Sequence, residues 1–223
     1  QNTLGVFGVQ DMPADFVGAQ IDATISDIGA DAVKVGMLSN TDIIELVASK
    51  IKEHEIKNVV VDPVMVAKGG AKLLRDDAVD SLRKVLVPLC TVLTPNIPEA
   101  SVLVGHDVKS VEDARSAASA IVDMGARIVV IKGGHLAGDA IDVLFDGHVF
   151  SELSAARIQT RNTHGTGCTF SSAIAAGLAK GLGVEESVVM AKDYVTKAIK
   201  DSLEIGRGHG PLNHFAAFSG WGR

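Results

Sequence analysis

Asn58-Val59-Val60-Val61-Asp62-Pro63-Val64-Met65 (residues 58–65) is the stretch that decides the fold. Three consecutive valines with no polar alternation are typical of a strand buried on both faces, and Pro63 ends that strand. Strands buried on both faces belong to mainly parallel sheets covered by helices. The stretch therefore predicts an α/β protein, with the acidic side chain of Asp62 at the carboxyl end of a strand.

Strands and helices alternate on both sides of this stretch. Strands are predicted at 2–9, 32–35, 58–62, 91–94 and 127–131, and Asp146-Gly147 predicts the turn of a hairpin between 141–145 and 148–153. Helices are predicted at 16–28, 41–51, 76–85, 98–104, 111–124, 166–180 and 185–203. Repeated βαβ units predict an α/β/α sandwich, a mainly parallel central sheet flanked by helices on both faces. No linker or internal repeat interrupts it, so residues 1–223 are expected to form a single domain.

Composition narrows the function. Hydrophobic residues make up 47% of the 223 residues and aromatic ones only 4%, so the core must be aliphatic. The net charge is −6 and no basic stripe exists, which argues against nucleic acid as a partner. The longest apolar runs are strand-sized, which argues against a membrane span. Cys90 and Cys168 lie far apart and read as free thiols of a reducing compartment, so a cytoplasmic protein is expected.

Polar or glycine-rich clusters follow several predicted strands. They are 34–37, 62–65, 94–99 and 132–135, and a fifth cluster, 162–169, precedes a helix. Because ligands gather at the carboxyl ends of strands in open α/β sheets, all five clusters are expected to converge on one ligand-binding edge.

The fifth cluster is the most informative. Gly165 and Gly167 bracket the start of an alanine-rich helix, where backbone N–H groups can turn toward one anion, such as a transferring phosphoryl group. A plain N-cap turn stays open, because short Gly-x-Gly signals are weak. Cys168 sits at the same helix entrance, where the local field is expected to lower a thiol's pKa and let it accept a substrate proton. A small thiol that merely packs is the alternative.

Three other clusters carry charged or amide side chains. Asn96 and Glu99 share a face of the next predicted helix, pointing to Mg²⁺ or its waters beside phosphates, or else to a capping arrangement. Asp62 faces the ligand crevice, and Lys132 is placed to neutralise a phosphate or is simply exposed. The Walker-type motif is absent, which argues against a P-loop kinase. The histidines lack metal-ligand spacing and are interpreted as surface or loop residues: His135, His164, His209 and His214.

Taken together, these clusters resemble the ribokinase-like superfamily and, within it, the hydroxymethylpyrimidine and phosphomethylpyrimidine kinases of thiamine synthesis. The resemblance runs over nearly the whole chain. It is carried by residues 1–6, 34–38, 62–65, 93–100, 131–135, 162–169 and 208–215. The stretch 163–169 is the most specific, because most ribokinase relatives carry Asp where Cys168 stands.

The resemblance implies a ribokinase-like fold and an ATP- and Mg²⁺-dependent kinase. It would phosphorylate 4-amino-5-hydroxymethyl-2-methylpyrimidine and then its monophosphate, as a homodimer. Gln1, Met37 and Val64 match positions that hold the pyrimidine. The nucleotide side is matched by Lys132, Asn96 and Asp62, with Asp62 and Glu99 for the metal. The anion hole is matched by Gly165, Thr166, Gly167 and Cys168, with Cys168 in the catalytic-base position.

The chain departs from the family at its start. The family begins earlier, with a strand and a glycine-rich segment that closes part of the substrate pocket, whereas this sequence opens at Gln1. If that stretch is truncated, the sheet is expected to lack a central strand; the alternative is that the stretch belongs to the protein and precedes Gln1. Two other functions stay open. Pyridoxal kinase uses a similar flat hydroxymethyl substrate on the same Cys-type scaffold, and a catalytically silent binding module would keep the pocket without the chemistry.

Overall fold

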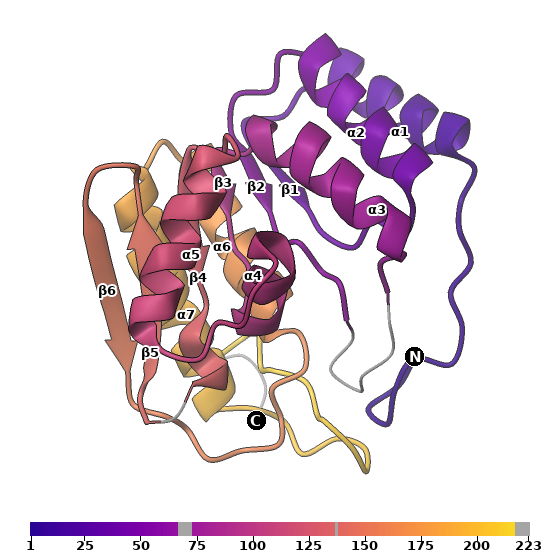
Figure 1. The fold of residues 1–223 in the computed structure, drawn as a ribbon. Helices are drawn as coiled ribbons and strands as arrows, with labels where there is room; N and C mark the ends of the chain where they lie inside the picture. Colours follow the sequence, from indigo (N-terminus) through magenta and orange to yellow (C-terminus); the bar gives the residue numbers. More distant parts are fainter. Residues whose placement is uncertain (67–72, 137, 217–223) are drawn as a thin grey trace.

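The computed structural model describes residues 1–66, 73–136 and 138–216, and they are organised around one six-stranded sheet (Figure 1). Its strands are β1 (Val33–Val35), β2 (Val59–Val61), β3 (Val92–Leu93), β4 (Ile128–Ile131), β5 (Ala140–Phe145) and β6 (Phe150–Ala155). They lie in the order β1-β2-β3-β4-β5-β6. Strands β1 to β4 pair in parallel, and β5 and β6 add the antiparallel hairpin predicted around Asp146-Gly147.

One face of the sheet is covered by a helix that precedes β1 and by the helices that connect the parallel strands. These are α1 (Ala14–Asp27), α2 (Thr41–Glu53), α3 (Asp76–Ser81), the π-helical turn η1 (Leu82–Leu86), the 3₁₀ turn η2 (Val87–Leu89), α4 (Ile97–Val104) and α5 (Val111–Asp123). Their apolar sides pack on Val59, Val61 and Leu93 of the sheet. Because successive strand residues point to opposite faces, Val60 and Val92 are left for the other side.

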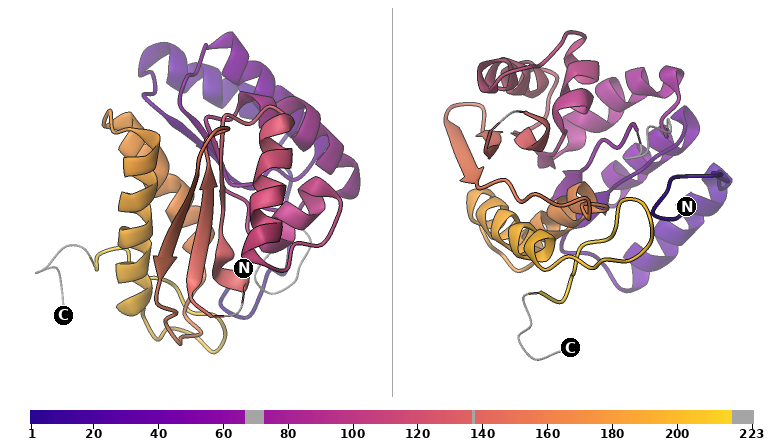
Figure 2. Two further views of the ribbon diagram at one scale, coloured as in Figure 1. Left: turned by 60° about the vertical axis from the view of Figure 1, so that its left-hand side comes forward. Right: turned by 90° about the horizontal axis from the view of Figure 1, so that it is seen from below.

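That other side is covered by α6 (Thr166–Ala179) and α7 (Val184–Lys200), which pack against each other and on Val60, Val92 and Val130. The left view of Figure 2 shows the sheet between these two helices and the other helix layer. The predicted α/β/α sandwich is confirmed, and its core is aliphatic, as the composition required. Within the described residues, no helix is long and apolar enough to cross a membrane.

The prediction for the first residues was wrong. Residues 2–9 form no strand, only a turn in which Asn2 and Gly5 pair with each other. The Asn2 side chain accepts the N–H of Leu4 at 2.9 Å, a local bond that competes with extended pairing. Leu4 and Phe7 are exposed, so these apolar residues do not belong to the core. The other predicted elements are present, with bounds shifted by a few residues.

Candidate active site

An ion pair lies at the carboxyl ends of the parallel strands, the edge at which the sequence predicts ligand binding. Asp62 follows β2 directly, and its backbone N–H extends the ladder by bonding the carbonyl of Val35 at 2.9 Å. Lys132 follows β4, where its N–H bonds the carbonyl of Pro95 at 2.8 Å. The Lys132 ammonium lies 2.6 Å from Asp62 Oδ1, and both side chains are largely buried. Strand ends far apart in the sequence thus place a carboxylate and an ammonium in contact.

The start of α6 lies against this ion pair. A methyl group added at Gly167 would stand 3.1 Å from Lys132 Nζ and 3.5 Å from Asp62 Oδ2, so only a glycine leaves this space open. Gly165, before the helix, has a φ of +86°, a left-handed conformation that favours glycine. Thr166 begins the helix and its hydroxyl donates to the carbonyl of Thr163 at 2.8 Å. The predicted turn therefore lies at the sheet edge, with Gly167 next to the Lys132–Asp62 pair.

Cys168 lies beside the same pair, but its acidity runs against the prediction. Burial of the thiol within the site raises the pKa of Cys168, although part of the residue stays exposed. The nearby Asp62 carboxylate raises this pKa further, while Lys34 and Lys132 lower it. The expectation of a lowered pKa was wrong because the carboxylate and desolvation outweigh the helix entrance. Without ligands the residue is a protonated thiol at neutral pH.

Asn96 and Glu99 form the capping arrangement that the sequence allowed. Asn96 Oδ1 accepts the N–H of Glu99 at 2.9 Å, and Glu99 Oε2 accepts the N–H of Asn96 at 2.8 Å. Burial raises the pKa of Glu99 to about 7, and nearby Asp62 adds to this, whereas Lys132 and backbone N–H groups oppose it. Glu99 is thus a buried carboxyl group close to the ion pair. Its role toward a metal ion stays a prediction.

The three residues predicted to hold the pyrimidine are less enclosed. Val64 is half-buried two residues beyond Asp62, and its N–H bonds the Asp62 carbonyl at 2.8 Å. Met37 follows the end of β1 and is 40% exposed, and Gln1 is exposed before the Asn2–Gly5 turn. Val64 and Met37 therefore come from the ends of neighbouring strands. Their contact with a substrate stays a prediction.

Comparison with known proteins identifies the family. The family model described as phosphomethylpyrimidine kinase matches residues 1–213. The chain belongs to the phosphomethylpyrimidine kinase family. A hydroxymethylpyrimidine/phosphomethylpyrimidine kinase of Bacillus subtilis is 49% identical over 218 residues, which cover 97% of this chain and 80% of the relative.

Two solved structures place the fold within the same group of kinases. The ADP complex of Bacillus subtilis pyridoxal kinase is 45% identical with a TM-score of 0.88, over 94% of this chain and 79% of that one. A phosphomethylpyrimidine kinase of Clostridium difficile is 40% identical with a TM-score of 0.79, over 89% and 82%. These similarities confirm the ribokinase-like kinase fold expected from the motifs and identify the protein as a phosphotransferase.

The geometry fits the magnesium nucleotide that a kinase uses. Asp62 and Glu99 offer two buried carboxylates, the hard oxygen ligands that Mg²⁺ prefers. The space kept open at Gly167 lies next to Lys132, a cation suited to a phosphate. The donor chemistry and the cradle thus agree with the family.

The tail of the chain forms hydrogen bonds with two segments, the loop before α6 and the segment after Gln1. The carbonyl of Gly210 accepts the N–H of His164 at 3.0 Å, and His214 Nε2 lies 3.0 Å from the hydroxyl of Thr169. On the other side, the N–H of His209 bonds the carbonyl of Thr3 at 2.8 Å. The right view of Figure 2 shows this tail running past the amino terminus. The loop before α6 and the segment after Gln1 are therefore connected through the tail.

Sequence reasoning missed Lys34 as a site residue. It stood inside the cluster 34–37, but its side chain was given no role. The alternation of side chains along a strand could have identified it. Val33 and Val35 point to one face of the sheet and pack in the core there, so Lys34 between them must point to the other face. The positive charge of Lys34 acts on Cys168, where it lowers the thiol's pKa.

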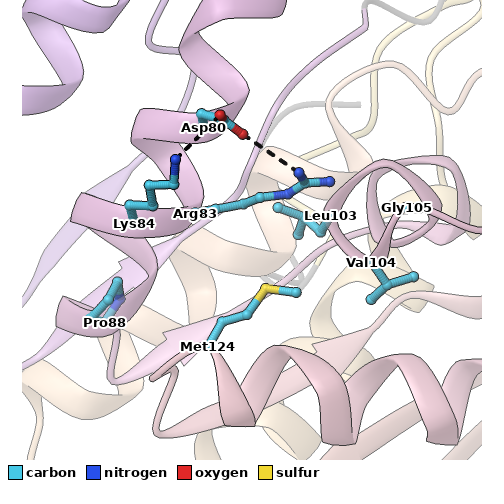
Figure 3. A pocket seen from close by; sticks show the side chains of 8 residues that line it. All are labelled: Asp80, Arg83, Lys84, Pro88, Leu103, Val104, Gly105 and Met124. Atoms are coloured by element: carbon cyan, nitrogen blue, oxygen red, sulfur yellow. Dashed lines mark hydrogen bonds and ion pairs between the residues drawn. The ribbon is translucent and has the colours of Figure 1, made fainter.

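Other clusters of the molecule lie away from this edge. A hollow of about 440 Å³ between η1, α4 and α5 is lined by residues including Arg83, Lys84 and Met124 (Figure 3). It lies near the amino ends of β3 and β4, opposite the ligand-bearing edge. Among the described residues one trio could hold a metal ion, Asp22, Glu53 and His54. The Lys50 ammonium bonds both carboxylates of the trio, at 2.6 and 2.8 Å, which makes it an ion-pair network.

Proposed function

We propose that this protein transfers the terminal phosphoryl group of MgATP to the hydroxymethyl group of 4-amino-5-hydroxymethyl-2-methylpyrimidine, and then phosphorylates the resulting monophosphate. The observation that carries the proposal is the contact of the Gly165–Cys168 turn with the Lys132–Asp62 pair. Phosphoryl transfer requires N–H donors, a cation and a carboxylate close to the transferring group.

Each group of residues has a part in this reaction. Lys132 and Asn96 bind the phosphates of ATP, and Asp62 and Glu99 hold Mg²⁺, which neutralises phosphate charge. To bind phosphate, Lys132 would exchange its bond with Asp62 for one to the nucleotide, and the ion pair at 2.6 Å supports a coupled role of the two side chains. The N–H groups at Gly165, Thr166 and Gly167 stabilise the negative charge that spreads over the transferring group.

Cys168 takes the proton of the substrate hydroxyl in the first transfer. It can do so only as a thiolate, and its raised pKa means that the free enzyme carries little thiolate at neutral pH. The charges of Lys34 and Lys132 favour the thiolate, so any step that separates Lys132 from Asp62 changes the balance at this thiol. The first transfer should therefore accelerate as the pH rises above neutrality.

The remaining features rest on the resemblance to the family. Gln1, Met37 and Val64 hold the flat pyrimidine ring. Residues 1–223 act as one kinase domain, a proposal supported by the single sheet that contains all six described strands. We further infer that the protein works as a homodimer in the cytoplasm.

Pyridoxal kinase is the second candidate function. The observation in its favour is the TM-score of 0.88 to a solved pyridoxal kinase at 45% identity. The hydroxymethylpyrimidine is preferred as the substrate because the family model is described as phosphomethylpyrimidine kinase. In addition, the Bacillus subtilis relative that is 49% identical is named hydroxymethylpyrimidine/phosphomethylpyrimidine kinase.

Side-by-side turnover decides between the two functions. Purified protein with MgATP is offered the hydroxymethylpyrimidine, its monophosphate and pyridoxal, and ADP release is measured for each. We expect both pyrimidines to be phosphorylated with a higher kcat/KM than pyridoxal. A preference for pyridoxal would reverse the ranking, and ligand binding without any ADP would leave a silent binding module.

A further inference from the structure

Lys34 lies on the same side of the sheet as the anion-binding turn. It occupies the middle of β1 and is in register with Val60 of β2. Val60 belongs to the core beneath α6 and α7, and α6 contacts both β1 and β2. Residues in register on neighbouring strands share a face, so Lys34 faces the helix that begins with Thr166 and carries Cys168.

The side chain of Lys34 reaches forward to the carboxyl edge of the sheet. A methyl group added at Gly36 would stand only 2.5 Å from Lys34 Nζ. The ammonium therefore lies over Gly36, immediately before Met37, in space that the missing side chain leaves. Lys34 thus approaches the site from the strand that supplies a proposed pyrimidine contact, whereas Lys132 approaches it from β4.

Lys34 also differs from other half-buried lysines in having no counter-ion. Within residues 1–66, 73–136 and 138–216 it makes no hydrogen bond or ion pair with a protein side chain. By contrast, Lys132 contacts Asp62, and Lys192 contacts Asp142. A half-buried ammonium without a partner is unfavourable, so a ligand that supplies negative charge would bind here with a large gain.

The two proposed transfers need different help from the protein. In the first, the hydroxyl oxygen of the substrate forms a bond to the terminal phosphorus, the bond to the ADP oxygen breaks, and the hydroxyl proton leaves to a base. In the second, an oxygen of the substrate's phosphate forms the new P–O–P link while ADP again leaves. That phosphate is already largely deprotonated at neutral pH. The second transfer therefore needs a cation to offset repulsion between two phosphates, more than it needs a base.

We propose that Lys34 binds the phosphate of the monophosphate substrate and thereby makes the second transfer possible. This inference rests on the proposed function and adds to it a specificity-determining residue for the phosphorylated acceptor. Lys34 lies on the strand that leads to Met37, has no partner among the described residues, and is close enough to Cys168 for its charge to act on the thiol. A phosphate attached to the pyrimidine's methylene group would bring its negative charge close to the Lys34 ammonium.

The test compares Lys34→Met with the unaltered protein on each acceptor. With saturating MgATP, we expect kcat/KM for the monophosphate to fall by about 10–100-fold, the value of a charge-assisted contact. Turnover of the hydroxymethylpyrimidine should fall by a much smaller factor, because Lys34 acts on that transfer only through the charge it adds near Cys168. Lys34→Arg, which keeps the charge, should recover part of the second transfer. Lys57→Met, an exposed lysine before β2, is the matched control and should leave both transfers unchanged.

Binding gives a second measurement that does not depend on turnover. Calorimetric titration of the monophosphate without ATP should show weaker binding to Lys34→Met than to the unaltered protein, with unphosphorylated substrate binding equally to both. Thermal melting should show no loss of stability, because the variant removes an unpaired charge.

Four outcomes would overturn the inference. Equal losses in both transfers would place Lys34 on the nucleotide or on Cys168, and no loss in either would leave it without a role. If the unaltered protein phosphorylates the alcohol but not the monophosphate, the inference fails while the kinase function stands. Failure of the unaltered protein on both acceptors would instead refute the proposed function itself, and the inference with it.

Discussion

Two buried lysine–aspartate pairs lie on this sheet, and they differ in what surrounds them. Lys132 contacts Asp62 at 2.6 Å, and Lys192 contacts Asp142 at 2.7 Å, with similar burial. Lys192 of α7 also donates to the carbonyl of Ala140 at 2.8 Å, and Asp142 also accepts the N–H of Gly133 at 2.9 Å. Backbone groups thus complete the second pair. The first pair faces the space kept open at Gly167 and the thiol of Cys168.

This difference separates a structural pair from a functional one. A buried pair that is fully hydrogen-bonded to the backbone fixes the chain, here at Gly133, where an added methyl group would collide with the carbonyl of Ile141. A pair whose charges bond chiefly to each other can be opened by a ligand that offers a better partner. We therefore expect variants of the two pairs to fail in different ways, one in stability and the other in activity.

The largest expected effect concerns the thiol beside the first pair. Cys168→Ala should lower kcat for the hydroxymethylpyrimidine by about 10²–10⁴-fold, the usual value of a general base, while substrate affinity changes little. Steady-state kinetics and calorimetric binding measure the two quantities. Cys90→Ala is the matched control, because Cys90 is the other free thiol and is buried in the core. It should lower stability without a comparable loss of kcat. An unchanged kcat in Cys168→Ala would reduce Cys168 to a packing residue.

The next effect tests the comparison of the pairs directly. Lys192→Met leaves Asp142 as a buried carboxylate without its cation, and we expect the free energy of unfolding to fall by roughly 3–5 kcal/mol. Lys132→Met should raise KM for MgATP strongly, whereas Lys192→Met should leave KM unchanged, because only the first pair adjoins Gly167 and Cys168. Urea unfolding and ATP kinetics on both variants check this. An equal rise of KM in the two variants would remove the distinction between the pairs.

The smallest effect is a pH dependence that comes from Glu99. Its pKa is raised from 4.5 to about 7 by burial, so the folded protein binds this proton more tightly than the unfolded chain. This contribution to stability is present below pH 4.5 and is lost as the pH rises through 7, amounting to about 3 kcal/mol. Relative to Glu99→Gln, the unaltered protein should therefore become less stable between pH 5 and 8 by about that amount.

Paired unfolding curves at each pH measure this difference. Glu186→Gln, at an exposed position in the first turn of α7, is the control and should show no such pH dependence relative to the unaltered protein. A constant difference between Glu99→Gln and the unaltered protein from pH 5 to 8 would contradict a buried, proton-binding Glu99.

Most of the fold could be predicted from the sequence because its signals are local. The valine run at 59–61 and the stops at Pro63 and Pro95 gave the strands, and Asp146-Gly147 gave the hairpin. The segment 2–9 could not be predicted in this way. Its apolar residues suggested a strand, but the side chain of Asn2 forms a turn. In addition, the tail N–H groups of Gly208 and His209 donate to the hydroxyl and the carbonyl of Thr3.

The site was predicted in part. The structure brings Asp62, Lys132, Glu99 and Cys168 close together, as expected because parallel strands bring their carboxyl ends to one edge, and their role toward a ligand stays a prediction. The pairing of Lys132 with Asp62 could not be read from the chain, since 70 residues separate them. The acidity of Cys168 was predicted in the wrong direction for the same reason, because the carboxylate that acts on the thiol comes from another strand.

The sequence by itself determined the α/β class, the succession of elements and the residue types available at the ligand edge, because hydrophobic period, proline and glycine act over a few residues. Only the tertiary structure decided which charges meet. Lys132 neutralises Asp62, Lys192 is fixed to Asp142, and Lys34 is left without a described partner. Electrostatic interaction depends on distance in space and on burial, and a folded chain sets both through contacts between residues far apart in sequence.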